Sequence, residues 1–377
     1  MKKESATDLG PCCESTVYCG GASDDGKPES PERYVHEPSS WVDRRLETLA
    51  GSIPVVKTAL SGRDKLGFAK VRLGIGRMNY SIRPGLYGIG NPNSDSLVFV
   101  SANYKLSFDM LRKELDGLDA WILVLDTKGI NVWCAAGKGT FGTDELVRRI
   151  EDTGLAKVIS HRTLILPQLG APGVAAHEVT KRSKFKVIYG PVRASDIKAF
   201  FKAGNKATPE MRRVRFTFRD RMILTLMELV QPFKYFAMIA AALWILSIFG
   251  LHFFSWRGLY PYLGAILVGA VLVPALLPWI PGRAFAFKGW LLGIGWAFFV
   301  NMFQGWILSS SSDWKQATVH FLLLPAISAF LAMSFTGSST YTSLSGVLKE
   351  MRFAVPAILA SAVLGLGFLV VVMTQVF

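Results

Sequence analysis

The sequence predicts an α/β domain followed by an all-α membrane domain of five transmembrane helices. Three observations predict this fold class. Short apolar runs alternate with amphipathic segments over residues 46–208, a pattern typical of an α/β domain with a largely parallel sheet. Over residues 233–377 the apolar runs reach the roughly 20 residues that a helix needs to cross a bilayer. Half of the 377 residues are hydrophobic, and the mean hydropathy of +0.31 is high for a purely soluble protein.

Residues 1–45 are expected to form a mostly disordered tail, because they are rich in Ser, Gly, Asp, Glu and Pro and show no periodicity. Three of the four cysteines, Cys12, Cys13 and Cys19, lie in it. The first residues lack the apolar core of a secretory signal, so we expect the soluble part in the cytoplasm, where thiols stay reduced. Two interpretations of these thiols remain open. They are either ordinary thiols on a tail or a capture site for a soft metal, and their spacing matches no zinc motif.

The α/β domain, residues 46–208, contains four predicted strands and five predicted helices. The strands are expected at 97–101, 121–125, 163–166 and 185–189. The helices are expected at 106–117, 131–137, 143–153, 173–182 and 194–203. In parallel sheets of this kind, ligands bind beyond the carboxyl ends of the strands. We therefore expect the functional site at that edge of the sheet.

Residues 209–232 are predicted to form a basic amphipathic segment on the membrane surface. The chain has a net charge of +14, and part of it is gathered here. The basic side chains are Arg212, Arg213, Arg215, Arg219 and Arg221. Their position directly before the first apolar run matches anionic lipid headgroups. No recognition helix or base-stacking motif accompanies them, so we expect no nucleic-acid partner.

The membrane domain, residues 233–377, is predicted to cross the bilayer five times. The spans are expected at 233–254, 259–280, 287–308, 316–335 and 354–376. With the N-terminal domain inside, the internal loops carry Arg283, Lys288, Lys349 and Arg352, and the external loops carry Arg257 and Lys315. The positive-inside rule thus predicts a multi-pass protein of the inner (cytoplasmic) membrane, with a cytoplasmic N-terminal domain and an external C-terminus.

Polar residues are rare in the predicted spans. His320 is the main ionisable group, and His252 lies near an external interface. An intramembrane histidine is either a functional group or a hydrogen-bonded structural residue, and both interpretations stay open. Loop 336–346 is dense in hydroxyls. It is either a hydrophilic connector or a surface that docks against the soluble domain.

The strongest candidate site is the stretch Asn131-Val132-Trp133-Cys134-Ala135-Ala136-Gly137-Lys138, which follows a predicted strand and a glycine turn. Asn131 is a good helix N-cap. Cys134 would then lie in the first helical turn, where backbone N–H groups and the helix dipole favour the thiolate. The small residues that follow would let a large flat ligand lie close to this backbone. The alternative is a buried, inert cysteine beside Trp133.

Other motifs in the domain are weaker. Gly137, Gly139 and Gly142 match the dinucleotide fingerprint in letters, but residues 131–138 separate them from the strand that should precede it. We interpret Gly142 and the residues after it as a turn and helix start. His161 and His177 lie in no Asp-x-His-x-x-Gly or zinc-protease motif, and there is no P-loop. Cys134 therefore remains the best metal-ligand candidate.

The stretch 126–139 resembles the cap-helix motif of the corrinoid protein of microbial mercury methylation (HgcA-type), a relative of the corrinoid iron–sulfur protein of the acetyl-CoA pathway. The similarity extends over 74–80, 91–93, 102–106, 166–179, 189–193, 336–346 and 349–351. It implies a Rossmann-like corrinoid-binding domain with a cap helix. It also implies a base-off cobamide whose cobalt takes Cys134 as its lower axial ligand, with the whole 131–138 stretch at the cofactor.

The resemblance also implies that Ser101 and Ser107 line the corrin site. The family more often has Thr at both positions, so the hydroxyl is kept and a methyl group is lost. The implied activity is transfer of a cobalt-bound methyl group to Hg(II), with a small two-[4Fe-4S] ferredoxin-like protein as electron donor. Two alternatives stay open. One is a membrane-anchored corrinoid methyl carrier of one-carbon metabolism, and the other is a non-enzymatic membrane sensor or transporter that binds a nucleotide.

Overall fold

The computed structural model describes residues 40–249, 254–307, 314–339 and 344–374. The chain divides into two compact units, Met1–Arg215 and Phe216–Phe377. Cys12, Cys13, Cys19 and His252 lie outside the described residues.

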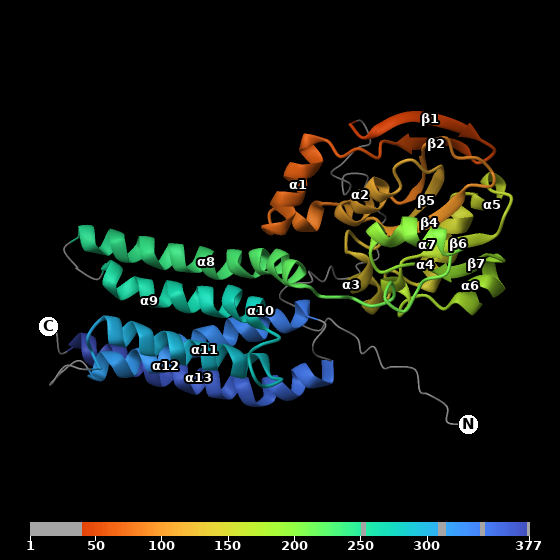
Figure 1. The fold of residues 1–377 in the computed structure, drawn as a ribbon. Coiled ribbons are helices and arrows are strands. Elements are labelled where there is room, and N and C mark those ends of the chain that lie inside the picture. The colour runs from red at the N-terminus through yellow and green to blue at the C-terminus, as the bar shows by residue number, and fades with distance from the viewer. Residues whose placement is uncertain (1–39, 250–253, 308–313, 340–343, 375–377) are drawn as a thin grey trace, which may run out of the picture. The chain divides into compact units, whose positions relative to one another are not determined.

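The first unit is built on a seven-stranded sheet with the strand order β1-β2-β3-β5-β4-β6-β7 (Figure 1). The strands are β1 (Val42–Thr48), β2 (Gly51–Val56), β3 (Gly85–Ile89), β4 (Leu97–Ala102), β5 (Ala120–Leu125), β6 (Thr163–Leu166) and β7 (Lys186–Tyr189). Strands β4 to β7 are the four that the sequence predicts, and their pairings with one another are all parallel. The predicted α/β class is confirmed.

The remaining strands make the sheet mixed. β3 runs antiparallel to β5, and β1 runs antiparallel to β2, while β2 and β3 are parallel. The sequence pattern did not indicate β1, β2 or β3. β1 is an edge strand whose polar side chains are largely exposed, and β3 is short and holds two glycines. Neither shows the continuous apolar run that marks a central strand.

Helices cover both faces of the sheet. They are α1 (Gly62–Arg72), α2 (Lys105–Glu114), α3 (Val132–Gly137), α4 (Thr143–Asp152), α5 (Leu155–Val158), α6 (Ala176–Ser183) and α7 (Ile197–Lys202). Side chains of β5 alternate between two cores, as strand geometry requires. Trp121 and Leu123 pack in one core with α4 and α6, and Ile122 and Val124 pack in the other with α2 and α7.

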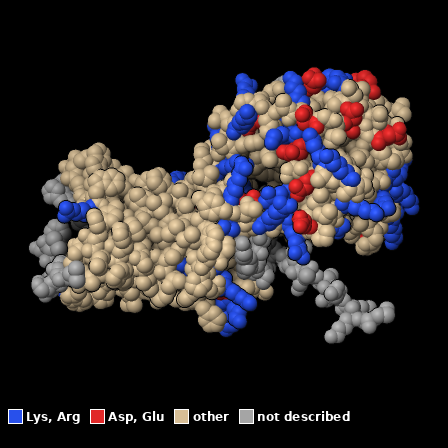
Figure 2. All heavy atoms as spheres, viewed as in Figure 1, with Lys and Arg blue, Asp and Glu red and all other residues tan. Residues whose placement is uncertain are grey.

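Five helices in the described part of the second unit are long and apolar enough to cross a membrane, as the sequence predicts. They are α8 (Phe218–Ile248), the segment Trp256–Leu276, α11 (Phe285–Phe303), α12 (Trp314–Ser334) and α13 (Leu344–Thr374). The second segment consists of α9 (Trp256–Leu267), a π-helical turn and α10 (Val273–Leu276). On the face shown in Figure 2, the sides of this bundle are almost free of charged residues. Such a surface suits lipid rather than water.

Helix α8 begins inside the predicted surface segment. Thr217 and Asp220 form a capping box at its start, each side chain accepting from the other residue's backbone N–H. The last part of the predicted surface segment and the first predicted span are thus one continuous helix. The Arg221 guanidinium is buried and donates to the carbonyl oxygens of Phe216 and Ala275 at 3.1 and 3.2 Å.

His320 is buried inside the helical bundle. Its Nδ1 lies 3.0 Å from Oδ1 of Asn301 on the neighbouring helix α11, and its ring contacts the rings of Tyr262 and Trp306. This pairing supports the structural interpretation of His320, because a hydrogen-bonded partner accounts for its burial. Loop 336–346 is described only in part, since 340–343 lie outside the described residues.

Candidate functional site

The site is organised by Asn103, directly after β4 at the carboxyl edge of the sheet. This buried amide holds the loop that follows the neighbouring strand β5. Its Oδ1 accepts from the backbone N–H of Thr127 at 3.1 Å, the hydroxyl of Thr127 at 2.8 Å and the N–H of Gly129 at 3.0 Å. Its Nδ2 donates to Asp126 at 3.1 Å. One side chain therefore fixes four groups of the 126–129 turn.

The turn itself needs left-handed backbone. Lys128 and Gly129 have φ values of 58° and 72°, a region that glycine occupies without strain. The hydroxyl of Thr127 also donates to the carbonyl of Ile130 at 2.7 Å. These contacts fix the direction in which the chain enters helix α3.

Helix α3 begins where the sequence predicts. Asn131 is its N-cap, and its side-chain oxygen accepts from the N–H of Cys134 at 2.9 Å. The helix is only six residues long, so its dipole is weak. Cys134 is half-buried.

The small residues after Cys134 have a different use from the predicted one. Ala135 and Ala136 are buried in the core between α3 and the loop after β6. A Cβ on Gly173 of that loop would lie 2.1 Å from the carbonyl oxygen of Phe141 and 3.0 Å from Cα of Ala136. The alanines are small because another backbone packs on them, and this structure does not bring them to an open ligand surface.

A cavity of about 420 Å³ lies beside the carboxyl ends of β4 and β6. Of the predicted site residues, five line it: Ser101, Ser107, Asn131, Val132 and Trp133. The other five, Cys134, Ala135, Ala136, Gly137 and Lys138, are not among the described residues that line it. The structure thus gathers one half of the predicted stretch at the cavity together with both serines, which come from β4 and α2.

Tyr104 links the cavity to Cys134. This phenol lines the cavity and is buried. Burial raises the pKa of Tyr104, the nearby guanidiniums of Arg77 and Arg72 lower it, and the negative charge of Cys134 raises it further. Tyr104, Cys134 and two arginines therefore share one electrostatic environment. Sequence reasoning did not single out Asn103 or Tyr104. Their signals were a polar pair directly after an apolar strand and their position in segment 102–106 of the family resemblance.

Four buried charges support helix α2 beneath the cavity. Lys105 pairs with Asp64 at 2.7 Å and with Asp109 at 2.5 Å. Arg112 pairs with Asp64 at 2.9 Å and with Asp109 at 2.7 Å. Burial alone would raise the pKa of Asp64, but the hydrogen bond and charge of Lys105 and the bonds to Ser61 outweigh it, so the pKa falls from 3.8 to about 2. We call Asp64, Lys105, Asp109 and Arg112 the charge quartet.

The other predicted motifs take structural positions. Gly139 forms a left-handed turn, and Gly142 is the N-cap of α4. His161 lies 3.0 Å from the carbonyl oxygen of Ser96, and His177 is exposed beside Glu178. Within the described residues no three His, Cys, Asp or Glu side chains gather as a metal site. The described residues alone therefore give Cys134 no set of protein ligands for a metal.

Residues 76–201 match the family model described as CO dehydrogenase/acetyl-CoA synthase delta subunit. The chain is 38% identical over 97 residues to the acetyl-CoA decarbonylase/synthase complex subunit gamma of Methanocaldococcus jannaschii, which covers 25% of this chain and 20% of the relative. The corresponding subunit of Archaeoglobus fulgidus is 31% identical over 126 residues, which covers 33% of this chain and 26% of the relative.

This chain therefore spans about a quarter or less of the length of these curated relatives. The matched segment holds Ser101, Asn103, Tyr104 and Cys134, and it ends before the first apolar helix. Residues 76–201 are thus a domain distantly related to the CO dehydrogenase/acetyl-CoA synthase delta-subunit family and to the gamma subunits of the acetyl-CoA decarbonylase/synthase complex.

Proposed function

We propose that this protein is a corrinoid-dependent methyltransferase that transfers a cobalt-bound methyl group to Hg(II), forming methylmercury. The observation that carries the proposal is the capped Cys134. A half-buried thiol is held in the first turn of a short helix, and the three residues before it line a cavity together with Ser101 and Ser107. The distant relationship of residues 76–201 to the acetyl-CoA decarbonylase/synthase subunits supports the corrinoid class.

The residues at this edge of the sheet fit such a cofactor by their chemistry. A thiolate is a soft, strongly donating ligand suited to a late transition metal. Among the described residues, Cys134 belongs to no group of three or more His, Cys, Asp or Glu side chains that could hold a metal ion by themselves. Aromatic and hydroxyl groups at the cavity, from Trp133, Ser101 and Ser107, suit a ring with polar edges. When bound, a corrinoid supplies a cobalt centre that carries the methyl group.

The protein's own groups would then perform three tasks. Asn131 and Asn103 hold the turn and helix that present the Cys134 sulfur. Arg72 and Arg77 lower the pKa of Tyr104, the same phenol whose pKa Cys134 raises, so they place positive charge on this part of the site. Ser101 and Ser107 offer hydroxyls that can donate to or accept from the edge of the cofactor. Val132 and Trp133 are included because they line the cavity, and Ala135, Ala136, Gly137 and Lys138 are included through their position directly after Cys134.

The partners and the location belong to the same proposal. Restoring reduced cobalt needs electrons, and the described residues contain no cluster of cysteines for an iron–sulfur centre. We propose a small two-[4Fe-4S] ferredoxin-like protein as the donor. The five apolar helices support membrane association. We propose the inner membrane with the α/β domain in the cytoplasm, since Arg283, directly before α11, and Lys349 and Arg352, near the start of α13, all lie at the end that the predicted topology places inside.

A second candidate is a membrane-anchored corrinoid methyl carrier of one-carbon metabolism. The observation that favours it is the similarity of residues in the α/β domain to gamma subunits of the acetyl-CoA decarbonylase/synthase complex. The nucleotide-binding sensor or transporter has less support, because Gly139 and Gly142 form a turn and a helix N-cap instead of a phosphate loop.

The test is co-expression of the full chain with a ferredoxin partner, followed by an absorbance spectrum and a mercury-methylation assay. A corrinoid spectrum with methylmercury production is expected. Cys134→Ala should abolish methylmercury formation, and Cys134→His should keep some corrinoid, because imidazole also ligates cobalt, while transferring methyl poorly. The control is the Cys12→Ser/Cys13→Ser/Cys19→Ser variant, which should bind corrinoid normally. Full activity of Cys134→Ala would refute the ligand role, and a corrinoid spectrum without methylmercury would favour the carrier.

A further inference from the structure

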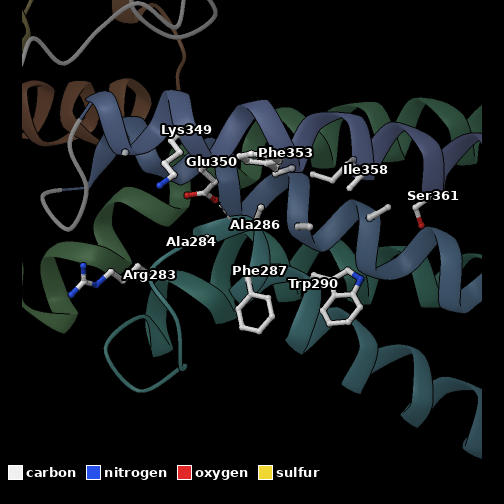
Figure 3. A pocket seen from close by; sticks show the side chains of 15 residues that line it. Arg283, Ala284, Ala286, Phe287, Trp290, Lys349, Glu350, Phe353, Ile358 and Ser361 are labelled. Carbon is white, nitrogen blue, oxygen red and sulfur yellow. Dashed lines mark hydrogen bonds between the residues drawn. The ribbon is translucent and has the colours of Figure 1, made fainter.

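The membrane unit contains a groove of about 970 Å³ that none of the preceding chemistry uses (Figure 3). It lies between the start of α11, the middle of α12 and the first half of α13. Its volume is at the upper end of the roughly 300–1,000 Å³ of typical ligand pockets.

One face of α13 forms the long wall of the groove. Gly346, Glu350, Phe353, Ala357 and Ser361 line it at the three- and four-residue spacing of a single helix face. The 15 residue-to-residue steps from Gly346 to Ser361 correspond to about 22 Å at 1.5 Å per step. The hydrocarbon layer of one bilayer leaflet is about 15 Å thick. The groove is therefore long enough to hold an acyl chain and the start of its headgroup.

The part of the groove that runs from Phe353 to Ser361 is apolar and open at its side. Phe287, Trp290 and Phe353 are 47%, 45% and 68% exposed, and Ala286 and Ala329 form a smooth buried floor. The hydroxyl of Ser361, at the far end, already donates to the carbonyl of Leu322 at 2.8 Å. Apart from this paired hydroxyl, the side chains of the described residues that line this part are apolar, so the wall suits a hydrocarbon chain.

Charge is concentrated at the opposite end. Arg283, Lys349 and Glu350 line the mouth (Figure 3). The carboxylate of Glu350 accepts from the N–H of Ala286 at 2.6 Å, which ties it to the first turn of α11. The charged side chains that line the groove are two cations, Arg283 and Lys349, and one anion, Glu350, so the groove has one more positive than negative charge. The mouth is therefore complementary to a single negative charge.

The charged end and the apolar end match the two ends of a membrane lipid. Helices α11 and α13 both start at the charged end, since α12 runs back between them, so the charged end lies at one membrane interface. We propose that this groove binds a monoanionic phospholipid. Its phosphate lies between Arg283 and Lys349, and one acyl chain lies along Phe353 and Ala357 toward Ser361. Basic pockets between transmembrane helices are a known means of recognising acidic headgroups.

The test measures phospholipid binding to the full-length protein in detergent by native mass spectrometry. Phosphatidylglycerol and phosphatidylcholine of identical acyl chains serve as probes. The unsubstituted protein should retain phosphatidylglycerol preferentially. Each basic side chain near a lipid surface contributes about 1 kcal/mol, so Arg283→Gln/Lys349→Gln should weaken phosphatidylglycerol binding about 30-fold. Inorganic phosphate at millimolar concentration should not displace the lipid, because it lacks the chain that fills the groove.

Two matched controls separate this site from general attraction. Lys234→Gln/Arg352→Gln removes the same charge from exposed positions outside the groove and should leave binding within about threefold. Ala357→Trp should fill the groove and weaken binding without a change of charge, whereas Ala360→Trp, exposed on the same helix outside the groove, should not. Equal binding of both lipids, equal losses in the two charge variants, or displacement by phosphate alone would overturn the proposal. None of these measurements depends on a corrinoid.

Discussion

The role of Asn103 leads to a prediction that separates charge from lost hydrogen bonds. Asn103→Asp keeps the Oδ1 that accepts from Thr127 and Gly129, but it replaces the donating Nδ2 with an oxygen 3.1 Å from a carboxylate oxygen of Asp126. Asn103→Ala removes the acceptor and the donor together. Both changes should loosen the turn that leads to α3, for different physical reasons.

The magnitudes follow from the geometry. Two unit charges about 3.1 Å apart repel by about 5 kcal/mol at an effective dielectric constant of 20, and Lys128, 3.3 Å from Asp126, reduces this. Protonating one carboxyl of pKa 3.9 costs about 4 kcal/mol at pH 7 and about 1.5 kcal/mol at pH 5. Because either carboxyl can take up a proton instead of repelling the other, the loss of stability of the turn in Asn103→Asp cannot exceed those two values. In Asn103→Ala, two backbone N–H groups lose their acceptor at about 1–3 kcal/mol each, independent of pH in this range.

The assay is hydrogen exchange of the full-length protein, read by mass spectrometry on the peptide that contains the N–H groups of Thr127 and Gly129. Relative to the unsubstituted protein at the same pH, Asn103→Asp should exchange up to about 1,000-fold faster at pH 7 and only about tenfold faster at pH 5. Asn103→Ala should accelerate the exchange by the same factor at pH 7 and at pH 5. Asn131→Asp is the matched control, because Asp and Asn cap helices equally well. If Asn103→Asp showed the same factor at both pH values, the buried contact with Asp126 would be wrong.

Two further predictions concern the surroundings of the site. The pKa of Asp64 is about 2 in the folded protein, against 3.8 for an unperturbed carboxyl, so its ionised form stabilises the fold by about 2 kcal/mol above pH 3.8, and this stabilisation is lost as the pH falls to 2. The protection of α1 against hydrogen exchange, compared with that in Asp64→Asn, should therefore decrease by about 2 kcal/mol between pH 5 and pH 2. A difference that stays constant over this pH range would contradict the lowered pKa of Asp64. Gly173→Ala would place a Cβ 2.1 Å from a backbone oxygen and should lower the melting temperature of the α/β domain, measured by calorimetry, by several degrees. The control Gly62→Ala, where a Cβ would meet open space, should leave the melting temperature unchanged. Equal melting temperatures for the two variants would contradict the close packing of Gly173 on α3.

Sequence reasoning succeeded where one physical effect dominates. β4 to β7 have apolar runs because both faces of the central sheet are buried, and such runs are visible in a single sequence. β1 was out of reach because an edge strand alternates toward solvent and carries Asp43, Arg44 and Arg45. The five apolar helices were predictable in number for the same reason as the central strands. Their ends were less so, since the capping box at Thr217 starts α8 well before the predicted span.

The candidate site was predictable only through local signals. Asn131 as N-cap of α3 follows from neighbouring residues and is confirmed. Asn103 lies 23 to 26 residues before the turn residues it contacts, and only the pairing of β4 with β5 brings it to the 126–129 turn. The packing of Gly173 on Ala136 is likewise a tertiary contact. Local pattern alone could not distinguish small residues that admit a ligand from small residues that admit another backbone.

The charge quartet has a consequence for how this domain can change over evolutionary time. Its four side chains carry balanced charge and are almost inaccessible to solvent. Removing one partner leaves a buried charge uncompensated and costs about 3–5 kcal/mol, whereas replacing a whole buried ionic group by apolar residues is often neutral. The four positions are therefore strongly epistatic. A lineage that replaces the four residues one at a time must pass through destabilised intermediates. We therefore expect the charge quartet to be retained even in relatives in which the chemistry at the neighbouring cavity has diverged.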